Sequence, residues 1–166
     1  MKILSVNAGS SSLKFQMYEM PEETVLISGV FERIGLDSSF YTIKINGEKI
    51  KKDANLSSHE DAVNILIKEL LENKVISSLD EIKGVGHRIV HGADKYSKSV
   101  VLNEEILKDI ESFNELAPLH NPANISGVRA FMKEIPSAVQ VGCFDTAFHQ
   151  TLKEERYRYA VPDEWY

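Results

Sequence analysis

Apolar residues follow two different periods along this chain, and this limits the folds that the chain can adopt. Short apolar or alternating stretches are typical of strands, and they occupy residues 2–7, 13–18, 24–31, 40–52, 82–91 and 139–144. Three later regions repeat apolar residues every three or four positions, as amphipathic helices do. Antiparallel strands followed by alternating helices and strands predict an α/β fold with a mixed sheet and flanking helices.

Two turn signals connect neighbouring strands into hairpins. The small residues from Ala8 to Ser12 separate the first two strands, and Asn46-Gly47 lies inside residues 40–52. Asn-Gly between alternating stretches favours a two-residue turn, because both residues tolerate positive φ. We therefore expect an opening hairpin and a small inserted hairpin near residues 40–52.

Three signals mark the starts of helices. Ser57 and Glu60 have the spacing of a capping box, and Asn103 precedes the second apolar repeat. Asn121-Pro122 is typical of a cap followed by proline at the first helical position. These signals predict helices near residues 59–74 and 103–134.

The composition is that of a folded protein without a bias toward nucleic acid. The 166 residues are 43% hydrophobic and 27% charged, which argues against disorder. The net charge of −6 gives no electrostatic reason to expect nucleic acid or an anionic membrane as a partner. No apolar run approaches the roughly 20 residues of a spanning helix, and no signal peptide begins the chain. We therefore expect a cytoplasmic protein.

The first motif that could carry chemistry is the opening turn. Small residues in a tight hairpin expose backbone N–H groups, and Ser10, Ser11 and Ser12 add hydroxyl donors. Such a concave turn suits phosphate oxygens. Lys14 adds a positive charge, and Asn7 could hold a metal ion or its water. On composition alone, an ordinary polar hairpin turn is the simpler interpretation.

The second motif contains two histidines and an arginine. His87 and His91 are four residues apart, so in a strand they lie about 13 Å apart and cannot bind one metal ion. Arg88 and Val90 should share a face of that strand. A guanidinium beside an apolar side chain suits a short-chain carboxylate, although a surface salt bridge is the commoner role of an arginine.

Two further motifs place single polar residues at the ends of elements. His120 precedes a predicted helix N-terminus, where it could donate to an anion together with the helix dipole. Asp145 follows a buried strand, and α/β sheets place their ligand sites at such ends. The alternatives are an exposed turn histidine and a capping aspartate. Cys143, the only cysteine, excludes an internal disulfide, and its apolar neighbours predict that it packs in the core.

Together and in this order, these motifs resemble the N-terminal half of the acetate kinases. The stretches that carry the resemblance are Val6–Phe15, His87–Gly92, Ala117–Asn124, Phe144–Gln150 and Ala160–Tyr166. The resemblance covers essentially the whole chain. The sequence departs from the family at Ala93-Asp94, where Gly-Glu is usual, and at Leu152-Lys153, where Met-Pro is usual. Neither departure falls on a candidate ligand.

The resemblance implies the fold of the acetate and sugar kinases, Hsp70 and actin, with a ribonuclease-H-like core. It also implies reversible transfer of the γ-phosphoryl group of ATP to acetate, which gives acetyl phosphate and ADP, with Mg²⁺ or Mn²⁺ as the metal. The site residues implied by the resemblance are Asn7 at the metal; Ser10, Ser12 and Lys14 along the ATP phosphates; Arg88, Val90 and Leu119 around the substrate; and His120 and Asp145 at the transferring phosphoryl group.

The family is more than twice this length, and the resemblance implies that its second lobe carries most of the adenosine site and the homodimer interface. We therefore expect residues 1–166 to be the N-terminal lobe, a truncated half that is inactive alone. Two alternatives stay open. One is a propionate or butyrate kinase of the same fold, since one methylene changes discrimination by only about 1–3 kcal/mol. The other is a non-catalytic single lobe that binds an anion.

Overall fold

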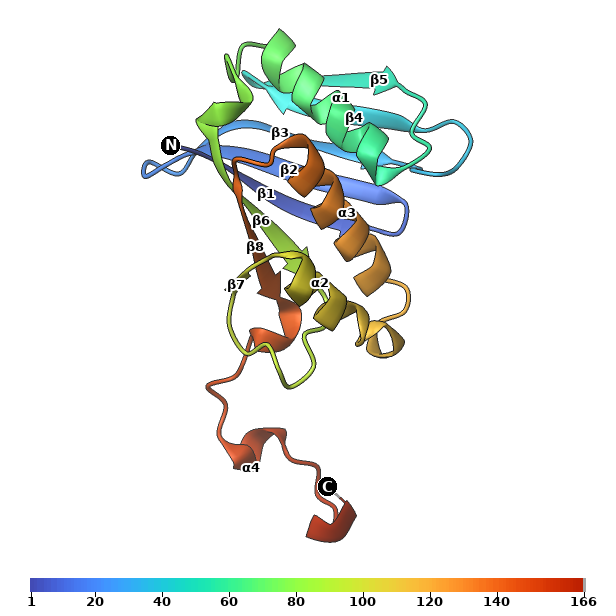
Figure 1. Ribbon diagram of the computed structural model, residues 1–166, viewed down its shortest axis with the longest axis vertical. Helices are drawn as coiled ribbons and strands as arrows, with labels where there is room; N and C mark the ends of the chain where they lie inside the picture. Colours follow the sequence, from blue (N-terminus) through green and yellow to red (C-terminus); the bar gives the residue numbers. More distant parts are fainter. Residues whose placement is uncertain (166) are drawn as a thin grey trace.

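The computed structural model describes residues 1–165, and in them eight strands form one mixed sheet (Figure 1). Their order across the sheet is β5-β4-β3-β2-β1-β6-β8-β7. The strands are β1 (Lys2–Gly9), β2 (Ser12–Glu19), β3 (Thr24–Glu32), β4 (Phe40–Ile45), β5 (Glu48–Asp53), β6 (Ile82–Ile89), β7 (Val100–Val101) and β8 (Val139–Phe144). The helices are α1 (His59–Glu72), α2 (Glu104–Glu111), α3 (Asn121–Glu134) and α4 (Glu154–Tyr157), with 3₁₀ turns at Leu79–Glu81, Asn114–Leu116, Asp145–Ala147 and Asp163–Trp165.

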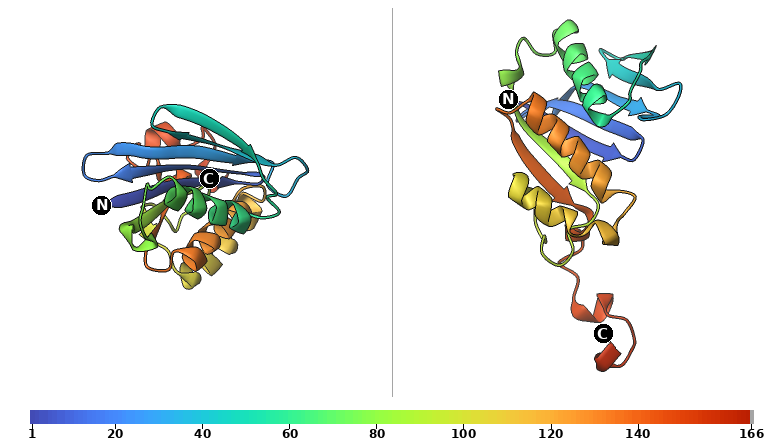
Figure 2. Two further views of the ribbon diagram at one scale, coloured as in Figure 1. Left: turned by 90° about the horizontal axis from the view of Figure 1, so that it is seen from above. Right: turned by 45° about the vertical axis from the view of Figure 1, so that its right-hand side comes forward.

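Parallel strands β1, β6 and β8 lie side by side in this sheet. Strands β1 to β5 continue from them as an antiparallel meander, and β7 pairs antiparallel with β8 at the opposite edge. Parallel neighbours need a crossover connection, which α1 provides before β6 and α2 with α3 provide before β8. Figure 2 shows these three helices on one face of the sheet. The predicted mixed α/β fold is confirmed, and the β4–β5 hairpin extends the sheet at its edge.

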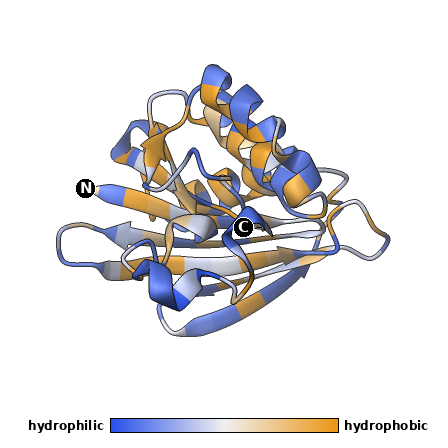
Figure 3. Ribbon diagram, turned by 90° about the horizontal axis from the view of Figure 1, so that it is seen from below, coloured by the Kyte–Doolittle hydropathy of each residue, from blue (hydrophilic) through white to orange (hydrophobic). Residues whose placement is uncertain are grey.

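The helices cover an apolar face of the sheet. Leu4 and Phe31 from the strands and Leu66 and Phe131 from the helices are fully buried in the core. Burying each such side chain contributes about 1.5–3 kcal/mol. In Figure 3, apolar and polar residues alternate along the strands. In β2, Leu13 and Phe15 are buried and Lys14 is exposed, whereas β8 instead buries Gln140 and leaves Val139 exposed.

The cap of α1 lies one residue later than predicted. Ser58 and Asp61, not Ser57 and Glu60, form the capping box. The Ser58 Oγ accepts a hydrogen bond from the Asp61 N–H at 3.2 Å, and the Asp61 carboxylate accepts one from the Ser58 N–H at 3.0 Å. The prediction was wrong because two consecutive serines and two consecutive acids repeat the same spacing.

The cap of α3 also differs from the prediction. His120 occupies the cap position, and Asn121 and Pro122 are the first two helical residues. Asn121 does not cap the helix because its buried side chain bonds the backbone of His91 instead. The predicted cap of α2 is confirmed, since Asn103 Oδ1 accepts from the backbone N–H of the third helical residue at 2.8 Å.

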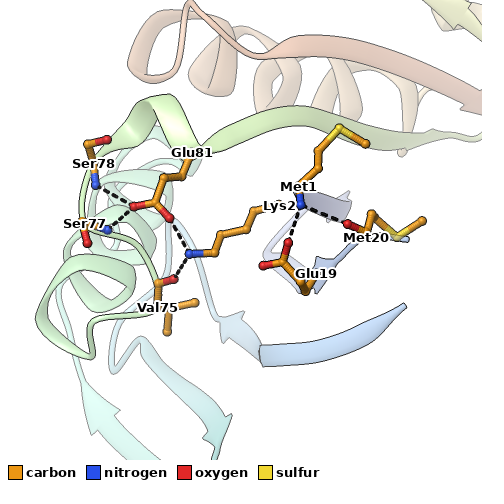
Figure 4. A network of polar contacts seen from close by, with 8 residues as sticks. All are labelled: Met1, Lys2, Glu19, Met20, Val75, Ser77, Ser78 and Glu81. Carbon is orange, nitrogen blue, oxygen red and sulfur yellow. Dashed lines mark hydrogen bonds and ion pairs between the residues drawn. The ribbon is translucent and has the colours of Figure 1, made fainter. Parts of the chain in front are cut away.

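Polar contacts fasten the start of β1 to the turn that leads into β6 (Figure 4). Lys2 Nζ donates to the carbonyl of Val75 at 2.6 Å and to Glu81 Oε2 at 2.5 Å. Glu81 Oε1 accepts from the backbone N–H of Ser77 at 2.6 Å. The bond from Lys2, followed by that from Ser77, lowers the pKa of Glu81 to about 2. These contacts hold two parallel neighbours together at their amino ends.

Residues 151–165 extend away from the rest of the structure (Figure 1). Tyr159 and Trp165 in this segment are 81% and 76% exposed. Tyr166, the last residue of the fifth matching stretch, lies outside the described residues. Within residues 1–165, every helix is too short or too polar to cross a membrane.

Candidate active site

Three candidate residues meet where the parallel strands end. Asn7 lies near the carboxyl end of β1, Arg88 is the penultimate residue of β6, and Asp145 directly follows β8. The register pairs Arg88 with Cys143, two residues before Asp145. Because β1, β6 and β8 are neighbours and parallel, their carboxyl ends bring side chains from three distant parts of the sequence together.

Arg88 and Asp145 form a multi-point ion pair. Arg88 Nε donates to both carboxylate oxygens at 3.0 Å, and Nη2 donates to Oδ2 at 2.6 Å. Arg88 Nη1 lies 3.5 Å from Asn7 Oδ1. Hydrogen bonding to Asp145 raises the pKa of Arg88 above its usual value, so the guanidinium is cationic. The salt bridge that the sequence left open for Arg88 is therefore present, and its partner is another candidate residue.

A hollow of about 570 Å³ lies over this ion pair, on the face of the sheet opposite the helices. Asn7, Arg88 and Asp145 contribute to its lining. A second hollow of about 580 Å³ adjoins it, because both are lined by Ser5 and Asn7. Lys14 lines the second hollow and is the cross-strand neighbour of Asn7. Both volumes lie in the range of small-molecule sites.

The opening hairpin places its serines at the tip of β1 and β2. Gly9 pairs with Ser12, so Ser10 and Ser11 form a two-residue turn. A side chain at position 9 would bring a Cβ within 3.1 Å of Ser12 Oγ, so glycine lets that hydroxyl lie close over the backbone. His59, the first residue of α1, supports the hairpin because its Nε2 lies 2.8 Å from the carbonyl oxygen of Gly9.

Val90, Leu119 and His120 do not line the hollow over Arg88. Strand β6 ends at Ile89, so the alternation that predicted a shared face for Arg88 and Val90 stops one residue before Val90. Leu119 is 75% exposed in the turn before α3, and His120 is exposed at the cap position. Their expected roles rest on the family resemblance.

Cys143 is exposed, so the prediction that it packs in the core was wrong. Strand β8 turns Gly142 and Phe144 toward the helices, and Cys143 therefore faces the opposite side. It lines the hollow over Arg88, and its sulfur accepts a weak hydrogen bond from Ser99 Oγ at 3.5 Å. The sequence contained a signal for this exposure, because residues two apart in a strand share a face and Cys143 lies two residues before Asp145.

The two histidines beside Arg88 have structural partners. His87 is 2% exposed, and its Nε2 lies 2.8 Å from Gln140 Oε1 on the neighbouring strand. Burial lowers the pKa of His87 to about 4, so this side chain is neutral at pH 7. His91 Nδ1 accepts a hydrogen bond from the backbone N–H of Ala93 at 3.0 Å.

Oxygen atoms in the hollow fit a metal ion that arrives with phosphate. Mg²⁺ usually binds one or two protein oxygens and completes its shell with phosphate oxygens and water. Among the described residues, the hydrogen bond that Asn7 Oδ1 accepts is the long one from Arg88, and the Asp145 carboxylate is part of the same lining. Within residues 1–165, no group of three His, Cys, Asp or Glu side chains is placed to hold a metal by itself. This donor set suits Mg²⁺ in its phosphate-bound form.

Comparisons with known proteins match the whole chain to one family. The model of the Acetokinase family matches residues 2–166. The acetate kinase of Bacillus mycoides is 54% identical over 165 residues, which are 99% of this chain and 42% of that protein.

Solved structures agree with this match. The Porphyromonas gingivalis acetate kinase has a TM-score of 0.91 at 45% identity, with 99% of this chain and 42% of that chain covered. A propionate kinase from Francisella tularensis has a TM-score of 0.86 at 40% identity, with 98% and 41% covered. The chain thus spans less than half the length of these relatives, and the fold class implied by the resemblance is confirmed. From its sequence and its structure alike, this chain belongs to the acetokinase family.

Proposed function

We propose that residues 1–166 are the N-terminal lobe of an ATP-dependent acetate kinase. The complete enzyme transfers the γ-phosphoryl group of ATP to acetate, reversibly, giving acetyl phosphate and ADP. The match to acetate kinases along the chain supports this proposal. The remaining length of those relatives supplies the second lobe, which carries most of the adenosine site and the interface of a cytoplasmic homodimer.

The observation that carries the proposal is the position of Arg88 at the strand ends, beside Asp145 and Asn7. Both reactants are anions, so a cation must hold acetate against the ATP phosphates. A guanidinium offers two parallel donors to a carboxylate. Without substrate, the Asp145 carboxylate occupies those donors, and acetate takes over some of them on binding. Val90 and Leu119 enclose the methyl group once the cleft closes.

The opening hairpin receives the phosphates of ATP. Ser10 and Ser12 supply hydroxyl and backbone donors at the hairpin tip, and Lys14, which lines the second hollow, supplies an ammonium donor beside Asn7. Asn7 and Asp145 are the residues that would hold Mg²⁺ or Mn²⁺, and the ion, when bound, neutralises phosphate charge. His120, at the N-terminus of α3, donates to the transferring phosphoryl group.

The test uses the full-length enzyme and the substitution Arg88→Lys. A lysine keeps the charge but loses the paired donors, so kcat/KM for acetate should fall more than about tenfold, or about 1.4 kcal/mol. Arg129→Lys is the matched control, because Arg129 pairs with Glu104 and Glu111 on the helical side. Unchanged acetate kinetics in Arg88→Lys would refute the assignment.

The propionate kinase relative makes substrate length a second question. We expect the full-length enzyme to prefer acetate to propionate and butyrate in kcat/KM, because the Bacillus mycoides and Porphyromonas gingivalis acetate kinases are 54% and 45% identical to this chain, against 40% for the propionate kinase. Acetyl, propionyl and butyryl phosphate can be measured side by side. A higher kcat/KM for propionate or butyrate would assign the longer substrate, and no product from any of the three would favour the anion-binding alternative.

A further inference from the structure

Two buried asparagines lie in the first turn of α3, and neither lines the hollow over Arg88. Asn121 and Asn124 belong to the motif that contains His120, yet they are 0% and 3% exposed. A buried amide is costly unless its donors and acceptor are bonded, and asparagine is a poor residue inside a helix. The hydrogen bonds that these two side chains make therefore decide what they do at these buried positions.

Asn124 connects the ends of β1 and β6, two of the three strands that carry the site. Its Nδ2 donates to the carbonyl of Ala8 at 2.5 Å, and its Oδ1 accepts from the backbone N–H of Val90 at 3.1 Å. Ala8 adjoins Asn7 at the end of β1, and Val90 follows the last residue of β6. The direct pairing of β1 with β6 ends at Val6 and His87. Beyond the last paired residues, the Asn124 amide therefore connects β1 and β6 in place of direct backbone hydrogen bonds. The size of this amide fixes the distance between Ala8 and Val90.

Asn121 holds the next residue of the same segment. Its Oδ1 accepts from the N–H of His91 at 3.1 Å, and its Nδ2 donates to the carbonyl of His91 at 3.0 Å. Both backbone polar groups of His91 are satisfied in this way, as a neighbouring strand would satisfy them. The first turn of α3 therefore acts as a substitute strand for the two residues that follow β6.

We propose that Asn124, supported by Asn121, is a positioning residue that sets the distance between the phosphate-binding hairpin and the carboxylate-binding end of β6. This inference rests on the function proposed above. In-line phosphoryl transfer requires the γ-phosphate and the carboxylate to be aligned, and a misplacement of about 1 Å can cost about 10²-fold in rate. Asn124 contacts neither reactant, and it acts through the backbone of Ala8 and Val90.

The test compares Asn124→Leu and Asn124→Asp in the full-length enzyme. Leucine has a similar size and no polar atoms, so kcat should fall about 10²-fold while both KM values change less than about threefold. A carboxylate cannot donate to Ala8, but a neutral carboxylic acid both donates and accepts as the amide does. The rate of Asn124→Asp relative to wild type should therefore recover as the pH falls, whereas Asn124→Leu should show no such recovery.

Ser39→Ala is the control for general destabilisation. Ser39 is also buried and bridges two backbone groups, at Ala54 and Leu56, beside the distant strand β4. The Ser39→Ala variant should have a lower free energy of unfolding than wild type and an unchanged kcat. Wild-type kcat in both Asn124 variants, or an equal loss of kcat in Ser39→Ala, would overturn the proposal.

Amide hydrogen exchange separates this proposal from the proposed function. Asn124→Leu should speed exchange together in residues 8–12 and 89–92, whereas Ser39→Ala should leave both segments unchanged. If the wild-type enzyme phosphorylates none of the three carboxylates, the proposed function fails. Exchange then still decides whether Asn124 couples the two segments, and protection as in wild type in Asn124→Leu would overturn that coupling.

Discussion

At the scale of single residues, the Arg88–Asp145 ion pair has good hydrogen-bond geometry but is exposed to solvent. The two side chains are 48% and 42% exposed. Solvent screening limits such pairs to at most about 1 kcal/mol of stability. In the function proposed above, the pair orients the guanidinium and places a carboxylate beside the incoming phosphoryl group.

Asp145→Asn in the full-length enzyme tests this role. Acetate is already ionised at neutral pH, so the reaction needs no base to remove a proton. The substitution should lower kcat by about 10²-fold or more and weaken the apparent Mg²⁺ affinity, because it removes the charge while keeping the shape. The acetate KM should not rise, since Arg88 loses a competing partner. Normal Mg²⁺ dependence, with a rate loss that higher pH rescues, would instead indicate proton transfer.

His87 makes stability depend on pH. Burial lowers its pKa from an ordinary 6.5 to about 4, so between these values the unfolded chain binds a proton that the folded chain does not. The contribution of His87 to the free energy of unfolding is fully present above about pH 6.5. It is lost as the pH drops toward 4, which lowers the free energy of unfolding by up to about 3 kcal/mol. Urea unfolding from pH 4 to 8 should show a flatter profile for His87→Gln than for wild type. The exposed His120 provides the control, and a wild-type slope in His87→Gln would contradict this account.

A position at a strand end singled out Asp145, whereas the expectation that Asn7, Arg88 and Asp145 belong to one site came from the family resemblance. The roles of Asn121 and Asn124 could not be predicted in this way. Their partners are backbone atoms at least 30 residues away, and no local pattern encodes such a contact. Cys143 was misplaced because its apolar neighbours were weighed more heavily than its position in the alternation.

At the scale of elements, α3 lies unusually close to β1. A Cβ at Gly127 would lie 2.7 Å from the Cβ of Ala8. Both atoms belong to rigid backbone positions, so neither can move away without shifting the helix or the strand. The glycine therefore determines how near the first turns of α3 approach the opening hairpin.

Gly127→Ala should destabilise the protein although alanine is the better helix former. Helix propensity alone would gain about 1 kcal/mol, whereas overpacking of a close contact costs about 1–3 kcal/mol. Ser126→Ala, at the exposed neighbouring position, is the matched control and should stabilise slightly. Urea unfolding of both variants measures the difference. Equal stability of the two would show that the helix adjusts at little cost.

The types and order of the main elements followed from periodicity, and their ends did so only within one or two residues. The inserted hairpin formed where Asn46 and Gly47 predicted it, and both residues have positive φ. Strand β7 was not predicted, because two residues carry no period and pair only through tertiary contact with β8. The cap of α1 was displaced because adjacent serines and acids repeat the capping-box spacing, and that of α3 because the Asn121 side chain bonds the backbone of His91 instead.

At the scale of the whole molecule, the candidate site lies on one open face. The helices lie on the other face of the sheet, and both hollows are open to solvent. Phosphoryl transfer depends on charge neutralisation from several sides and on closure that excludes water. In the proposed function, this lobe provides the carboxylate clamp, the hairpin and one set of metal ligands. The relatives extend well beyond the matched region.

We therefore expect the 166-residue chain to fold without turning over. Its two apolar clusters each join strands to helices, and α3 contributes residues to both, so urea unfolding should be cooperative. Acetyl phosphate formation should be undetectable, because water reaches the half-exposed Arg88–Asp145 pair and the reaction needs closure that excludes water. Adding the remaining part of the enzyme as a separate chain should restore activity, and Arg88→Lys in the first chain should weaken that restoration. Turnover by the 166-residue chain alone, within about tenfold of the full-length enzyme, would show that one lobe is sufficient for catalysis.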